Sequence, residues 1–271
     1  MLPTMPHDVI YDFGMNNGDD VEYYLMKGPR VVGVEANPVL CAEVARRFPE
    51  HIKNGDLVIL NFALSADDDG KLLTFYVHKT NHVLSQLPRP ADDALPHFEQ
   101  IRVPSRTASS IVAEHGEPSY IKIDVEHFDL VVLKELFAAG ILPPEISAES
   151  HSADIFAELV AAGYRSFNLV EGRTVSSVYR SATISTSTGR TSFAFKPHSA
   201  GPFGNDLTTP WEDVDTFFYT LAAAGLGWKD IHASRTIPPG PPPSPQTMAM
   251  RQGMGLMRKV LAGLSRRIFP G

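Results

Sequence analysis

The stretch YDFGMNNGDD, residues 11–20, places an acid and two spaced glycines directly after the apolar run DVIYDF. The spacing Asp12-x-Gly14-x-x-x-Gly18 predicts a sharp turn from a buried strand into a helix. A turn without Cβ atoms lets a ligand approach the backbone, and the N–H groups of the following helix point toward that ligand. Acid–glycine turns are common, so this motif alone is a weak indication of a ligand site.

A second acid strengthens this interpretation. Glu35 lies 23 residues after Asp12, at the end of the predicted strand RVVGVEA. In nucleotide-binding βαβ units, a carboxylate about 20 residues after the first glycine-rich turn accepts hydrogen bonds from the ribose hydroxyls. Asn16 stands where the dinucleotide fingerprint has its second glycine, which disfavours close approach of a pyrophosphate. The pattern therefore favours a nucleoside ligand without phosphates, such as S-adenosylmethionine, over the cofactor of an NAD-dependent oxidoreductase.

Four motifs, in order, resemble the FkbM family of S-adenosylmethionine-dependent methyltransferases. They are VIYDFGMNNGDDVEYYL, VVGVEANP, NFALSADDDGKLLTFYV and YIKIDVEHFDLVVLKEL. The similarity extends from Asp8 to Glu149, about half of the chain. It implies a class I methyltransferase fold, with a seven-stranded sheet whose last strand is antiparallel, and usually methyl transfer to a hydroxyl oxygen.

The resemblance also implies roles for residues at the strand ends. Those that would bind S-adenosylmethionine are Asp12, Gly14, Asn16, Asn17, Gly18, Glu35, Ala36, Asn37, Ala63 and Leu64. Asp124 would either contact the ammonium group of the cofactor or orient the acceptor. Where the family typically has Asp-Val-Glu-Gly, this chain has His127 in the glycine position. That side chain either narrows the acceptor pocket, takes part in catalysis, or faces water at the start of a helix.

A hydroxyl acceptor benefits from a base that removes its proton as the new bond forms. The candidate catalytic residues at carboxyl strand ends are Asp124, Glu126, Glu149 and His151. We expect His151 to be the base, because the pKa of an imidazole lies near neutral pH. The alternative is that His151 caps the helix SADIFAEL. Asp124, Glu149 and His151 also offer ligands for Mg²⁺, a second cofactor that the sequence leaves open.

The elements that must position these residues alternate between short apolar strands and amphipathic helices. The predicted strands are DVIYDF, RVVGVEA, LVILNFAL, SYIKIDV, EISAES and YRSFNLV, with TSFAFK expected to close the sheet. Predicted helices include DDVEYYLMK, ending near Gly28, and one that starts at Asn37 and Pro38. This alternation predicts an α/β, doubly wound, mostly parallel Rossmann-like sheet with helices on both faces. Ligands bind such sheets at the carboxyl ends of the strands.

We expect four parts along the chain. Residues 1–200 form the methyltransferase domain, in which KLLTFYVHK makes an extra hairpin arm beside the candidate acceptor contacts Asn81 and His82. Residues 201–235 form a lid-like or cap-like element of the same domain, in which GPFG is either a hinge or a packing turn. Residues 236–247 are a proline-rich linker, and residues 248–271 a basic amphipathic tail. The sequence leaves three alternatives for the tail. It is a disordered extension, or a helix packed on the body or on a second subunit of a homodimer, or a weak membrane-surface anchor.

Composition excludes several classes of protein. A net charge of −7 argues against a general nucleic-acid binder, although six basic and no acidic residues follow Asp230. The single cysteine, Cys41, excludes an intrachain disulfide and fits a reducing compartment. No apolar run approaches the roughly 18 residues of a membrane span, and the N-terminus lacks a secretory signal pattern. We therefore expect a cytoplasmic protein.

The predicted function is an S-adenosylmethionine-dependent O-methyltransferase whose acceptor is a hydroxyl of a sugar, oligosaccharide or glycoconjugate. The preference for a sugar comes from the family resemblance and from acid-rich strand ends suited to hydroxyl groups. The alternatives are O-methylation of a non-sugar secondary metabolite and a non-catalytic nucleoside-binding module.

Overall fold

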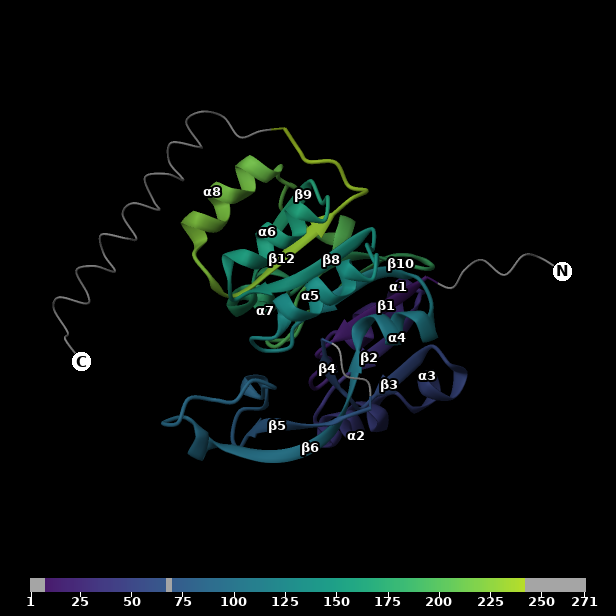
Figure 1. Cartoon of the computed structure of the whole chain (residues 1–271). Helices are drawn as coiled ribbons and strands as arrows, with labels where there is room; N and C mark the ends of the chain where they lie inside the picture. The colour runs from purple at the N-terminus through teal and green to yellow at the C-terminus, as the bar shows by residue number, and fades with distance from the viewer. Residues whose placement is uncertain (1–7, 67–69, 242–271) are drawn as a thin grey trace.

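The computed structural model describes residues 8–66 and 70–241, and within them seven strands form a central sheet (Figure 1). The strands lie in the order β3-β2-β1-β7-β8-β12-β9, and β12 is antiparallel to both of its neighbours. This is the strand order of a class I methyltransferase, so the predicted fold is confirmed. The sheet strands are β1 (Val9–Phe13), β2 (Arg30–Val34), β3 (Leu57–Leu60), β7 (Pro118–Ile123), β8 (Glu145–Ser150), β9 (Ser166–Glu171) and β12 (Gly227–Ser234).

Helices cover both faces of the sheet, because alternate residues of a strand point to opposite sides. Tyr11 and Phe13 of β1 are buried with side chains of α4, α5, α6 and α8, whereas Ile10 is buried with side chains of α1 and α2. The α-helices are α1 (Val21–Lys27), α2 (Pro38–Arg47), α3 (Pro49–Asn54), α4 (Ala108–His115), α5 (Asp129–Ala138), α6 (Ala153–Ala161), α7 (Val175–Val178) and α8 (Val214–Ala224). Short 3-10 turns are η1 (His82–Leu84), η2 (Leu95–His97), η3 (Gly172–Thr174) and η4 (Gly204–Asp206).

The predicted helix signals near the first two strands are confirmed. The Asn37 side chain accepts a hydrogen bond from the backbone N–H of Val39 at 3.0 Å, and Pro38 occupies the first turn of α2. The predicted strand LVILNFAL, however, divides into β3 and β4 (Ala63–Ser65). Asn61 lies between them, and its Nδ2 donates to the carbonyls of Glu35 and Ala36 at 2.9 Å each. The side chain of Asn61 therefore holds the end of β2 in place.

The predicted hairpin arm is also present. β5 (Leu72–His78) pairs along its length with β6 (Phe98–Thr107) in antiparallel register, and β6 pairs with β4 at its other end. The two long strands extend away from the central sheet, in blue below it in Figure 1. The arm thus lies near the carboxyl ends of β1 and β2.

The expectation that TSFAFK closes the sheet is wrong. β11 (Gly189–Phe193) pairs with β10 (Ala182–Thr186) in a separate two-stranded hairpin, and β12 is the strand inserted between β8 and β9. The polar sequence WKDIHAS concealed this strand, because Asp230 and His232 are polar residues that the fold buries. Sequence patterns predict buried strands from apolar residues and therefore overlook such a segment.

Residues 201–235, expected as a lid-like element, contribute α8 and β12 to the body of the domain. The GPFG segment is a packing turn: the ring of Phe203 stacks on that of Tyr120, with 3.9 Å between their centroids. Residues 248–271, the expected basic tail, lie outside the described residues, as does the linker beyond Pro241. In the described part of the chain, every helix is too short or too polar to cross a membrane.

Candidate active site

A cavity of about 470 Å³ lies at the carboxyl ends of β1, β2, β7 and β8, between the sheet and the β5–β6 arm. The residues expected to bind the cofactor that line it are Gly14, Asn16, Asn17, Glu35, Ala36, Ala63, Leu64 and Asp124. The residues expected to act in catalysis that line it are Asp124, Glu126, Glu149 and His151. Asp12, Gly18 and Asn37 are not among the lining residues, although Asn37 donates its backbone N–H to Glu35 and Asp12 pairs with Lys122, which both line the cavity. The structure therefore brings the two expected groups together in one place.

The turn after β1 is held in left-handed backbone conformations. Gly14, Asn16 and Gly18 have φ values of 85°, 51° and 69°. A Cβ atom on Gly14 would lie 1.8 Å from the carbonyl oxygen of Asp124, so the ends of β1 and β7 approach too closely for any side chain. Gly18 faces the other way, and a Cβ there would lie 2.8 Å from Val44 of α2. The first glycine therefore shapes the cavity, and the second packs the helix behind it.

Glu35 joins this turn to the end of β2. One carboxylate oxygen accepts a hydrogen bond from the backbone N–H of Asn16 at 2.9 Å, and the other accepts one from Asn37 at 2.7 Å. Burial raises the pKa of Glu35 to about 7, against the opposing effect of these two hydrogen bonds. Each carboxylate oxygen has a second lone pair. The side chain can therefore accept two further hydrogen bonds from a ligand in the cavity.

Lys122, a charged residue at the centre of the site, was not predicted from the sequence. Its Nζ lies 3.2 Å from Oδ1 of Asp12 and 3.4 Å from Oδ2 of Asp124, and it donates to the carbonyl of Gly14 at 3.2 Å. Burial lowers the pKa of Lys122, but the surrounding aspartates, with Asp20 among them, raise it well above its usual value. The signal was a single lysine inside the apolar strand YIKI, since a lysine is almost never fully buried without a charged partner.

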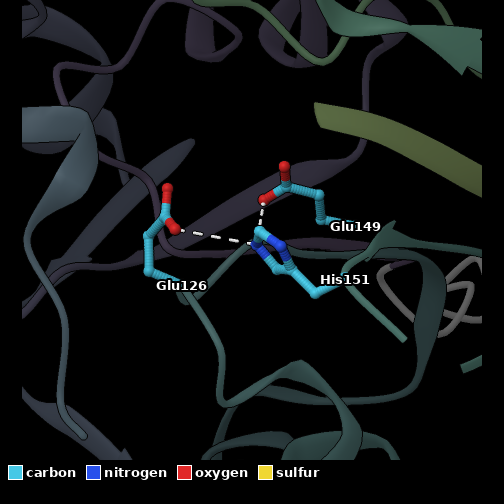
Figure 2. Close-up of side chains that lie close together, drawn as sticks. All are labelled: Glu126, Glu149 and His151. Carbon is cyan, nitrogen blue, oxygen red and sulfur yellow. Dashed lines mark ion pairs between the residues drawn. The ribbon is translucent and has the colours of Figure 1, made fainter. Parts of the chain in front are cut away.

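A second group of side chains gathers where β7 and β8 end. Nε2 of His151 lies 2.8 Å from Oε2 of Glu149 and 3.6 Å from Oε2 of Glu126 (Figure 2). Glu149 comes from β8, His151 directly follows that strand, and Glu126 lies in the loop after β7. The alternative that His151 caps α6 is wrong, because Ser152 occupies the cap and its Oγ accepts from the backbone N–H of Asp154 at 3.0 Å.

The carboxyl groups near His151 hold their protons unusually tightly. Burial, reinforced by the neighbouring carboxylate of Asp124, raises the pKa of Glu149 to about 9 and that of Glu126 to about 8. Burial and Asp124 likewise raise the pKa of Asp129 to about 7. Strongly perturbed acids in a cavity are typical of functional sites. Here they mark a place where negative charge has gathered and a proton or a cation is favoured.

His127, in the position of the family glycine, has a φ of 66°. This left-handed conformation is one that glycine adopts freely and that other residues adopt at a cost. The residue is exposed, and its ring centroid lies 4.5 Å from that of His151. Burial and the neighbouring His151 lower the pKa of His127. The histidine thus lines the cavity beside the expected base, at the expense of local strain.

The far rim of the cavity is aromatic. Trp228, at the start of β12, is 39% exposed, and its ring stacks on that of His198 with 6.2 Å between centroids. His198 in turn contacts His82 of the arm, with 5.9 Å between ring centroids. Asn81 and His82, the expected acceptor contacts, both line the cavity. Neither Trp228 nor His198 was predicted from the sequence as a site residue.

Comparison with known proteins agrees with this architecture. The sequence profile of the family described as "Methyltransferase FkbM domain" matches residues 12–166. A search of curated proteins gives no match.

The solved structures that the chain matches include several methyltransferases. Precorrin-6y C5,15-methyltransferase from Geobacter metallireducens GS-15 is 10% identical, with 71% of this chain and 76% of that chain covered and a TM-score of 0.35. A TehB-like SAM-dependent methyltransferase from Corynebacterium glutamicum is 12% identical, with 62% and 71% covered and a TM-score of 0.33. The N1-methyltransferase for 1,6-didemethyltoxoflavin from Burkholderia thailandensis, solved with S-adenosylhomocysteine, is 12% identical, with 84% and 71% covered and a TM-score of 0.32.

The family profile covers more than half of the chain, from the acid of the first turn to the start of β9. Together with the strand order of the sheet, this match shows that the chain belongs to the FkbM family of S-adenosylmethionine-dependent methyltransferases.

Proposed function

We propose that this methyltransferase transfers a methyl group to a hydroxyl oxygen of a sugar, oligosaccharide or glycoconjugate. The observation that carries the proposal is the convergence of Glu126, Glu149 and His151 on the same cavity as the glycine turn and Glu35. One end of the cavity thus suits a nucleoside, and the other suits the activation of a weakly acidic group.

The cofactor end fits S-adenosylmethionine on the chemistry of its residues. The two oxygens of Glu35 are positioned by backbone N–H groups and retain lone pairs for the two ribose hydroxyls. Ala63 and Leu64 supply an apolar wall for the adenine, and Asp124 supplies a carboxylate for the ammonium group. When bound, the cofactor supplies an electrophilic methyl group: the acceptor oxygen bonds to the methyl carbon while the carbon–sulfur bond breaks and its electron pair stays on sulfur.

The acceptor end favours oxygen over nitrogen as the methylated atom. A neutral amine attacks without first losing a proton, whereas a hydroxyl is a poor nucleophile until its proton begins to leave. The imidazole of His151, which faces the carboxyl groups of Glu126 and Glu149, is the group that assists this loss. Holding the acceptor oxygen in line with the methyl group contributes the rest of the rate enhancement.

The rim of the cavity supports a sugar as the acceptor. Trp228 lies at the rim of the cavity and is 39% exposed, and the carboxyl groups and Asn81 provide hydrogen-bonding groups in the lining of the same cavity. A pyranose offers a C–H face for the indole and hydroxyl groups for the polar side chains. The arm adds the apolar residues Phe75, Leu84 and Leu87 to the cavity wall. These side chains favour a second acceptor class, the hydroxyl of a non-sugar metabolite.

A methyl-transfer assay tests this function. The full-length protein and S-adenosylmethionine are mixed with a panel of mono- and oligosaccharides and a matched panel of phenols and aliphatic alcohols, and S-adenosylhomocysteine is measured together with the mass of the acceptor. We expect transfer to a saccharide, and a loss of about 100-fold or more in kcat with His151→Ala, while the affinity for S-adenosylmethionine changes less than twofold. Transfer to amines alone would overturn O-methylation, and transfer to non-sugar alcohols alone would overturn the sugar assignment.

A further inference from the structure

Three side chains from two neighbouring strand ends direct their ligand atoms toward a single point. Glu126, Glu149 and His151 each offer one such atom, and these atoms lie within 4.8 Å of one another. Figure 2 shows both carboxylates facing the same imidazole nitrogen. Because β7 and β8 are parallel neighbours, their carboxyl ends lie side by side, and the loop that follows β7 carries Glu126 toward Glu149 and His151.

The contacts within this group are unlike those of an ordinary hydrogen-bonded ion pair. Nε2 of His151 is buried and makes no hydrogen bond, although Oε2 of Glu149 is only 2.8 Å away. The Glu149 side chain is 6% exposed, so water has little access to its carboxylate. Two oxygens and a nitrogen therefore surround one point without a shared proton in hydrogen-bond geometry. A positive ion at that point would satisfy all three atoms.

We infer that Glu126, Glu149 and His151 form a binding site for a divalent cation of the Mg²⁺ and Mn²⁺ class. Carboxylate oxygens are the ligands that these hard cations prefer, and the imidazole shifts the preference toward Mn²⁺. Three protein ligands occupy half of the about six positions of an octahedral ion. The remaining positions face the cavity, where water and an acceptor hydroxyl can bind.

The ligand set differs from the one expected from the sequence, which combined Asp124 with Glu149 and His151. Oδ2 of Asp124 lies 3.4 Å from the ammonium group of Lys122, and Asp124 is not part of the group whose ligand atoms lie within 4.8 Å of one another. Glu126 is the carboxylate that lies near the imidazole instead, at 3.6 Å. The left-handed backbone at Glu126, with a φ of 39°, turns the chain so that this side chain returns toward β8.

The role of the ion depends on the proposed O-methylation. A divalent cation lowers the pKa of a hydroxyl bound to it, so that the proton passes to water as the oxygen attacks the methyl carbon. In this arrangement His151 is a cation ligand rather than the base, because its Nε2 is directed at the cation. Activity should then disappear on chelation and return with Mn²⁺ or Mg²⁺.

Binding of Mn²⁺ to the full-length protein, in the absence of cofactor and acceptor, tests the site directly. Protein treated with a chelator and dialysed is titrated with Mn²⁺, and free Mn²⁺ is followed by electron paramagnetic resonance. We expect one Mn²⁺ per chain, and affinity at least tenfold weaker in Glu149→Gln and in His151→Ala. Glu117→Gln is the matched control, because Glu117 is exposed at the opposite end of β7. Calorimetric titration with S-adenosylmethionine verifies that every variant is folded.

The outcomes separate this inference from the proposed function. Wild-type protein that binds no Mn²⁺, or variants that bind it as tightly as Glu117→Gln, would overturn the cation site. If methyl transfer to a hydroxyl then persisted in the presence of chelator, O-methylation would stand and His151 would return to its role as base. Mn²⁺ binding that depends on Glu149 and His151, without transfer to any hydroxylated acceptor, would support the site and overturn the proposed acceptor class.

Discussion

Lys122 and Asp12 are register partners on the parallel strands β7 and β1, and Nζ of Lys122 lies 3.2 Å from Oδ1 of Asp12. Both side chains are buried, with exposed fractions of 3% and 0%. The same ammonium group donates to the carbonyl of Gly14, the first residue of the turn that lines the cavity. One buried charge thus links the centre of the sheet to the cofactor end of the site.

Replacing Lys122 with methionine is expected to destabilise the protein strongly. Removal of one partner from a buried ion pair leaves an uncompensated charge, which costs about 3–5 kcal/mol. We expect this loss in the free energy of unfolding, measured by urea denaturation. The double variant Asp12→Asn/Lys122→Met should recover part of it, because the buried carboxylate is gone. Asp12→Asn alone completes the cycle, and a loss in the double variant equal to the sum of the two single losses would show that the two residues are not coupled.

The pKa of Glu35 predicts how nucleoside affinity depends on pH. Burial raises this pKa to about 7, so the carboxyl group is protonated below that pH and ionised above it. Ribose hydroxyls donate to the ionised form, so affinity should be constant above pH 7 and fall by up to about tenfold per pH unit below it.

Calorimetric titration with 5′-methylthioadenosine at several pH values measures this dependence. That ligand contains the ribose and adenine but lacks the titratable α-amino and carboxyl groups of the methionine part of S-adenosylmethionine. Glu35→Gln should bind more weakly and show no dependence on pH over the same range. A wild-type affinity that rises as the pH falls would contradict a role for the carboxylate as acceptor.

Local patterns in the sequence predicted the turn at Gly14 and its partner Glu35, whereas the contacts of Lys122 and His151 depend on strand pairing and loops distant in the sequence. The turn at Gly14 and the acid at Glu35 belong to one βαβ unit, so spacing along the chain was enough to bring them together. Lys122 is 110 residues from Asp12, and only the pairing of β7 with β1 makes them neighbours. His151 was expected from its place at a strand end, but its contact with Glu126 depends on the left-handed loop that no apolar pattern reveals. Trp228 lines the cavity because it lies on β12, and this strand was not predicted because it buries polar residues.

Removing the side chain of His127 is expected to stabilise the protein. A residue with a Cβ atom costs about 1–2 kcal/mol in the left-handed region, where this histidine has a φ of 66°. His127→Gly should therefore raise the free energy of unfolding by about 1 kcal/mol, after the greater chain entropy of glycine is subtracted. His127→Ala, which keeps the Cβ, is the control and should show no such gain in urea denaturation. Turnover by the glycine variant then measures whether the imidazole contributes to catalysis: an unchanged kcat leaves it only a lining role.

The position of Trp228 depends on Gly172 beneath it. A Cβ atom added to Gly172 would lie 2.4 Å from Nε1 of Trp228, so Gly172→Ala must push the indole out of its place at the rim of the cavity. If the indole contacts the acceptor, KM for the acceptor should rise by about tenfold, which corresponds to about 1.4 kcal/mol, while the affinity for S-adenosylmethionine stays the same.

A double-mutant cycle distinguishes displacement of the indole from general disruption. Trp228→Ala alone should raise KM by a similar factor, and the double variant Gly172→Ala/Trp228→Ala should be no worse than Trp228→Ala, because the clash disappears with the indole. Additive effects would show that Gly172→Ala acts through the backbone of η3 instead. An unchanged KM in Trp228→Ala would remove the indole from the acceptor site, and with it the main structural support for a sugar.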